Sequence, residues 1–105
     1  MSRSDAGVPI IRDRAALDSV CRRHHIWTLK LFGSALRDDF GPQSDVDLLV
    51  EFEPGYVPGF LRLHVIAEEL SSLAGNRPID LVTLAALNPR MRDRVLADAE
   101  VLFAA

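Results

Sequence analysis

The chain has 105 residues, 49% of them apolar and 26% charged, which describes one small globular domain over residues 1–105. Fifteen acidic against twelve basic residues give a formal charge of −3, which excludes the positive excess that supplies non-specific nucleic-acid affinity. The single cysteine, Cys21, cannot form an internal disulfide, and neither a secretory signal nor a membrane-length apolar run is present. We therefore expect a cytoplasmic protein whose small, polar residues 1–8 are flexible.

The first elements are a predicted helix and a predicted strand. Between residues 13 and 25, apolar side chains recur at helical spacing with charged side chains opposite them, which predicts an amphipathic helix. Residues 26–32 then alternate, which predicts a strand. Its buried face is expected to carry Trp27, Leu29 and Leu31.

The middle of the chain predicts a second strand and a second helix. Gly33-Ser34 follows the first strand, and alternation of apolar and acidic residues resumes over residues 45–52. A loop rich in Pro and Gly occupies residues 53–59. Beyond it, an apolar stripe from Leu63 to Ala74 predicts a helix that ends at the following glycine.

The last third of the chain predicts a short strand over residues 78–83 and a closing helix. Asn88 is placed to cap this helix, with Pro89 at its first position, and apolar residues continue at helical spacing as far as Leu102. The order of elements predicts an α/β (α+β) fold. It should contain a small mixed β-sheet of three to four strands with helices packed on one face.

The stretch between Asp38 and Glu53 holds six acidic residues and no basic one. Asp45 and Asp47 lie two residues apart on the predicted strand, so their side chains leave the same face, with roughly 6.5–7 Å between Cα atoms. Neighbouring carboxylates repel unless a cation lies between them, and Mg²⁺ binds carboxylates together with waters and phosphate oxygens. The pattern alone leaves open that these acids are the solvated face of a half-buried strand.

Gly33 and Ser34 stand between a predicted strand and a short predicted helical turn. A glycine at this place lets the backbone approach a ligand closely, and the Ser34 hydroxyl and free N–H groups can donate to phosphate oxygens. A phosphate site would then lie beside the carboxylates. Taken alone, the pair also fits an ordinary turn.

Together these residues resemble a known signature. Gly33-Ser34, ten residues, Asp45, one residue and Asp47 are similar to the pattern of the DNA polymerase β-like nucleotidyltransferase superfamily. The surrounding residues resemble its small prokaryotic branch, the minimal nucleotidyltransferases or MNT-domain antitoxins. That branch carries a third carboxylate on a later strand, which Asp80 matches, and the resemblance covers about residues 31–103.

The resemblance implies transfer of a nucleoside monophosphate, AMP from ATP or the equivalent from another NTP, to an acceptor hydroxyl. It implies that Asp45 and Asp47 are catalytic residues that bind two Mg²⁺ ions, and that Asp80 holds the catalytic ion and helps activate the acceptor. Such a pair of ions stabilises the attacking and leaving oxygens of an in-line displacement.

The resemblance also implies that Gly33 and Ser34 bind the β- and γ-phosphates and that Arg37 contacts a phosphate oxygen. From the residues alone, Arg37 fits an ion pair with Asp38 or its neighbour equally well. Many relatives have a glycine where this chain has Asp38, which leaves the details of the phosphate contact open.

As a partner, the resemblance implies a helical HEPN-domain toxin that accepts the nucleotide on a hydroxyl. A chain of this length has little room for an acceptor site of its own, so a second protein has to present that hydroxyl. One alternative is a non-catalytic antitoxin that neutralises its toxin by binding alone, and another is a plain acidic structural domain. Assembly with a partner or with a second copy stays open.

Overall fold

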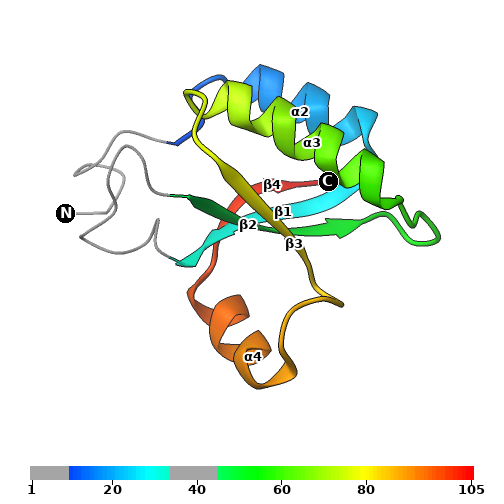
Figure 1. The fold of residues 1–105 in the computed structure, drawn as a ribbon, viewed down its shortest axis with the longest axis vertical. Helices are drawn as coiled ribbons and strands as arrows, with labels where there is room; N and C mark the ends of the chain where they lie inside the picture. Colours follow the sequence, from blue (N-terminus) through cyan, green and yellow to red (C-terminus); the bar gives the residue numbers. More distant parts are fainter. Residues whose placement is uncertain (1–9, 34–44) are drawn as a thin grey trace.

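The computed structural model describes residues 10–33 and 45–105, so the predicted flexible residues 1–8 lie outside the described ranges. None of the helices in these ranges is long and apolar enough to cross a membrane. In chain order (Figure 1) the elements are α2 (Arg14–Arg23), β1 (Ile26–Phe32), β2 (Val46–Phe52), α3 (Phe60–Leu73), β3 (Ile79–Thr83), α4 (Pro89–Asp98) and β4 (Glu100–Ala104).

The four strands form one mixed sheet in the order β3-β2-β1-β4. β1 lies antiparallel to both β2 and β4, whereas β2 and β3 are parallel. The chain passes from β2 to β3 through α3, because parallel neighbours need a crossover connection. This four-stranded mixed sheet confirms the predicted fold class.

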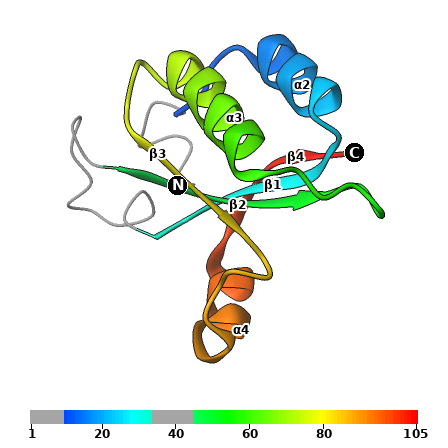
Figure 2. The same ribbon diagram turned by 45° about the vertical axis from the view of Figure 1, so that its right-hand side comes forward.

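Helices α2 and α3 lie side by side over one face of the sheet (Figures 1 and 2). Their apolar stripes meet the inward side chains of the central strands, and the main core contains Leu17 of α2, Ile66 of α3 and Leu48 of β2. Each of these side chains is fully buried. The core therefore holds β2 and the crossover helix in fixed relation, which positions the start of β2.

Helix α4 lies on the opposite face of the sheet (Figure 2), where a second apolar cluster contains Leu49, Leu87 and Val95. In this detail the arrangement differs from the expectation that all helices pack on one face. Leu49 is the physical reason. It stands among the acidic residues on the outer face of β2, and an apolar side chain there is buried only if another element covers it.

The predicted closing helix is too long by several residues. α4 ends at Asp98, Ala99 is extended, and β4 pairs with β1 instead of continuing the helix. Phe103 of β4 is buried in the main core. Pairing satisfies the backbone groups at the open edge of β1 and buries Phe103, and this tertiary gain outweighs a weak helical periodicity.

Trp27 is not a core residue, because 48% of it is exposed. Ile26 pairs with Phe52 and Thr28 with Glu51, so β1 carries one extra residue between these pairs. Such a bulge shifts the alternation of side chains. The buried face of β1 therefore begins at Ile26.

Candidate active site

Two of the three predicted carboxylates lie at the same level of neighbouring strands. Asp47 of β2 and Asp80 of β3 are register partners in the parallel ladder. Neighbouring strands lie about 4.7–4.9 Å apart, and register partners on such a pair point to the same face. The fold thus brings together two acids that are far apart in the sequence, as the hypothesis of a shared site requires.

The third predicted carboxylate, Asp45, directly precedes β2 and is exposed. Asp47 is half-buried, and Asp80 is exposed on β3, the edge strand of the sheet. Asp45 and Asp47 both interact with other groups of the chain. All three acids therefore lie near the beginning of the parallel strand pair, with Asp45 and Asp80 exposed.

Gly33 lies against the side chain of Asp47. Phe32 pairs with Asp47 in the antiparallel ladder, so the residue after β1 comes close to the carboxylate. A Cβ atom at position 33 would lie 3.0 Å from Cγ and 3.2 Å from Cβ of Asp47, and closer still to Oδ2. Gly33 also has a φ of +75°, a conformation that other residues rarely adopt. Glycine thus suits this position in two ways, because it adopts the turn and because it leaves room for the Asp47 carboxylate.

The same face carries one cation that the sequence interpretation did not single out. Lys30 is half-buried and pairs with Leu49, and it alternates with Phe32, so it shares the face of Asp47. Lys30 comes next to the acidic strand through the antiparallel register of β1 and β2. Strand alternation gives its face from the sequence, but its neighbours become known only with that register. Farther along, Glu51 accepts a hydrogen bond of 3.1 Å from Thr28.

The predicted phosphate contacts are only partly described. Ser34 and Arg37 lie outside the described residues, whereas Gly33 lies at their border. The described part of the site therefore consists of Gly33, the three aspartates and the flanking Lys30.

The carboxylate oxygens of the three aspartates are of the chemical type that binds a hard divalent cation. Carboxylate oxygens are the ligands that Mg²⁺ prefers, and Asp47 and Asp80 are adjacent while Asp45 is two residues away. Within residues 10–33 and 45–105, no three His, Cys, Asp or Glu side chains stand close enough to hold a metal ion as they are. The described side chains therefore do not form a three-ligand site as they stand, although Asp47 and Asp80 lie side by side on neighbouring strands.

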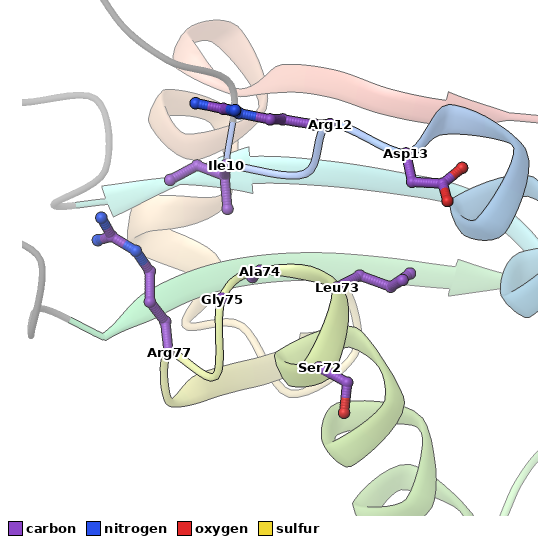
Figure 3. Close-up of a pocket in the computed structure, with 8 residues that line it drawn as sticks. All are labelled: Ile10, Arg12, Asp13, Ser72, Leu73, Ala74, Gly75 and Arg77. Carbon is purple, nitrogen blue, oxygen red and sulfur yellow. The ribbon is translucent and has the colours of Figure 1, made fainter.

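A hollow of about 530 Å³ lies elsewhere, between the start of α2 and the end of α3 (Figure 3). It is lined by Ile10, Arg12, Asp13, Ser72, Leu73, Ala74, Gly75 and Arg77. None of the candidate carboxylates lines it. This hollow is therefore a separate feature of the molecule.

Comparisons with known proteins agree with this geometry. The family model described as polymerase beta, nucleotidyltransferase matches residues 16–105. The Thermococcus cleftensis protein adenylyltransferase MntA is 34% identical over 76 residues, which cover 72% of this chain and 74% of that relative.

Solved structures show the same fold. One provisionally described as a minimal nucleotidyltransferase is 38% identical, with a TM-score of 0.66 over 82% of this chain and 85% of that one. A toxin–antitoxin crystal structure with AMP-PNP is 20% identical, with a TM-score of 0.69 over 90% of this chain and 75% of that one. The matched chain in a complex of tri-AMPylated Shewanella oneidensis HEPN toxin with MNT antitoxin is 19% identical. Its TM-score is 0.61, over 88% of this chain and 70% of that one. The family match, the relative and the first structure together show that the chain belongs to the polymerase beta nucleotidyltransferase family, among its minimal nucleotidyltransferases.

Proposed function

We propose that the protein is a Mg²⁺-dependent nucleotidyltransferase that moves AMP from ATP to a hydroxyl of a HEPN-type toxin, and that it acts as the antitoxin of that pair. The observation that carries the proposal is the register pairing of Asp47 with Asp80 beside Gly33. The named activity of the Thermococcus relative and the AMPylated toxin in the Shewanella complex support the donor and the partner.

In this proposal the three aspartates hold the metal ions. Asp45 and Asp47 would hold both ions, and Asp80 would hold the catalytic ion. Bound Mg²⁺ supplies neutralisation of the charge that develops on the transferred phosphoryl group. Gly33, Ser34 and Arg37 bind the β- and γ-phosphates of the nucleotide.

The exposure of the site supports a macromolecular acceptor. Asp80 lies on the edge strand β3 and is exposed, so an acceptor can approach it from the side of the sheet. A hydroxyl on the surface of a second protein fits such an open face. The donor, ATP, and the single cysteine suit a cytoplasmic protein, so we also propose that compartment.

A binding-only antitoxin is the second candidate. It is favoured by one observation, namely that no three His, Cys, Asp or Glu side chains of the described residues are grouped closely enough to hold a metal ion. Such a protein would cover the toxin without modifying it. The two candidates make opposite predictions for the acidic residues.

The deciding experiment incubates the protein with α-labelled ATP, Mg²⁺ and a purified HEPN-type toxin. We expect label on the partner, and loss of labelling and of protection in cells with Asp47→Asn and with Asp80→Asn. Asp18→Asn, a change of the same kind on the surface of α2, should leave labelling intact. Full protection by both site variants, without any labelling by the unchanged protein, would establish the binding-only function instead.

A further inference from the structure

An exposed apolar surface lies at the beginning of α3. Four large apolar residues with exposed fractions from 44% to 90% fall within residues 57–65, namely Val57, Phe60, Leu61 and Val65. The other exposed residues of this kind in the described ranges are isolated in the sequence, at positions 27, 91 and 101. We call residues 57–65 the apolar end of α3. Exposed large apolar side chains grouped in this way on a small domain mark a place where another molecule binds.

The apolar end continues into an exposed stripe along α3. Leu61, Val65, Glu68 and Ser72 follow each other at spacings of four, three and four residues, which places them on one face of the helix. All four are exposed, whereas Ile66 and Leu70 of the same helix are buried in the core. The stripe is thus the face of α3 that nothing else in the described chain covers.

The stripe ends at the hollow of about 530 Å³ that Figure 3 shows. Ser72 belongs to both, and the apolar lining consists of Ile10, Leu73 and Ala74. In Figure 3 the side chain of Ile10 lies between the guanidinium groups of two arginines, Arg12 and Arg77. Helix α3 has 14 residues, so its apolar end and the hollow are about 20 Å apart along one face.

We propose that two copies of the chain form a symmetric dimer in which the α3 helices pack antiparallel, with the two-fold axis near Val65. In this arrangement, residues equally far from Val65 on either side face each other across the interface. Phe60, the first residue of α3, then comes level with Leu70 of the second copy. The apolar end of each copy therefore lies along the C-terminal half of the other α3, towards the hollow, so that one surface pairs with itself as in a two-fold dimer.

The charges on α3 favour the same arrangement. Arg62 lies three residues before Val65 and Glu68 three residues after it, and both are exposed. The antiparallel dimer brings Arg62 of each copy beside Glu68 of the other, so the ion pair forms twice. A parallel packing would instead bring like charges together. Within one chain, Glu68 pairs with His64 at 3.3 Å, with both side chains 67% exposed, and such a surface pair is easily exchanged.

This surface is distinct from the proposed catalytic face. α3 covers one face of the sheet and α4 the other (Figure 2). Asp47 alternates with the core residue Leu48, and Asp80 is its register partner, so both belong to the face of α4. A dimer through α3 therefore leaves both catalytic faces open to a partner. The inference does not rest on the proposed function, and it holds or fails by the assembly of the chain alone.

The first test measures the mass of the isolated protein in solution by sedimentation equilibrium over a range of concentrations. We expect a monomer–dimer equilibrium, and Leu61→Glu should raise its dissociation constant about tenfold or more, because a charge is placed in the apolar contact. Met91→Glu changes a residue of α4 that is also exposed, and it should leave the dissociation constant unchanged. Circular dichroism verifies that each variant is folded. A monomer at every concentration overturns the proposal, even if the partner toxin then covers this surface.

The second test measures the geometry. Val65→Cys should form a disulfide between two copies under mild oxidation. The two Cβ atoms lie beside the two-fold axis, so their separation can reach the roughly 3.5–4.5 Å that a disulfide needs. Val101→Cys, exposed on β4, should cross-link far more slowly. Arg62→Glu should weaken the dimer, and combining it with Glu68→Arg should restore it. Equal cross-linking rates of the two cysteine variants, or no restoration by the paired exchange, would contradict the antiparallel arrangement.

Discussion

Asp47 occupies the space beside Gly33 that a side chain at position 33 would need, since a Cβ there would lie 3.0 Å from Cγ of Asp47. The contact follows from the register of β1 and β2, in which the last residue of β1 pairs with Asp47. A glycine whose expected role is to let a phosphate approach the backbone also leaves room for a candidate metal ligand. The turn and the carboxylate are therefore one structural unit.

Gly33→Ala should damage the site through this contact. The methyl group displaces the Asp47 carboxylate and strains a backbone with a φ of +75°, so we expect loss of nucleotidyl transfer and a stability loss of roughly 2–4 kcal/mol. Gly55→Ala is the matched control, because Gly55 has a φ of +84° and nothing within 4 Å of an added Cβ. It should lose only about 1–2 kcal/mol and keep activity. Urea unfolding and the labelling assay separate the two effects, and equal loss of activity in both variants would contradict this account.

The pairing of Asp47 with Asp80 predicts a response to metal. Like charges on register partners repel, so Asp80→Asn should raise the free energy of unfolding in EDTA by up to about 1 kcal/mol. Adding Mg²⁺ at roughly 100 times its dissociation constant should stabilise the unchanged protein by about 2.7 kcal/mol, and the variant much less. The measurement is the melting temperature with and without Mg²⁺. An equal gain in both proteins would show that Asp80 does not bind the ion.

The elements that local patterns decide could be predicted from the sequence. The alternation over 26–32 and 45–52 found β1 and β2, and the predicted cap of α4 by Asn88 is confirmed, while Asp13 caps α2 in the same way. Asp13 accepts a hydrogen bond of 3.0 Å from the Ala16 N–H, and Asn88 accepts one of 2.9 Å from the Arg90 N–H. Each of these signals involves residues a few positions apart, which is why a single sequence reveals them.

The features that depend on distant pairing could not be predicted in this way. β4 forms because β1 offers it an open edge, α4 crosses to the other face because Leu49 needs cover, and Trp27 is exposed because a bulge shifts β1. For the candidate site, the spacing predicted three acids, Asp45, Asp47 and Asp80. Only the register revealed that Asp47 adjoins both Asp80 and Gly33.

Cys21 should be unreactive in the folded protein. Burial, aided by the negative charge of Asp18, raises the pKa of its thiol from 9.0 to about 12, so the thiolate is scarce at neutral pH. We expect alkylation by iodoacetamide only after unfolding. Because the folded state holds this proton more tightly, stability should fall as the pH rises from about 9 towards about 12. Cys21→Ala should have a smaller loss over that range, and an identical pH dependence of both proteins would refute the effect.

The contact of His24 with Glu69 joins the end of α2 to α3, and we expect its loss to lower the stability of the fold. His24 is only 3% exposed, and its Nε2 lies 3.2 Å from Oε1 of Glu69, which also pairs with Arg23 at 3.3 Å. The other ring nitrogen, Nδ1, is buried and makes no hydrogen bond within the described residues.

Glu69→Ala would therefore leave a buried imidazole without its one described polar partner, at a cost of about 1–3 kcal/mol. Asp18→Ala removes a carboxylate of α2 whose exposed contact with Arg22 spans 4.0 Å, and it should change stability by less than about 0.5 kcal/mol. Urea unfolding at neutral pH measures both variants. A cost for Glu69→Ala no larger than that for Asp18→Ala would show that the helices are held together by their apolar contacts alone.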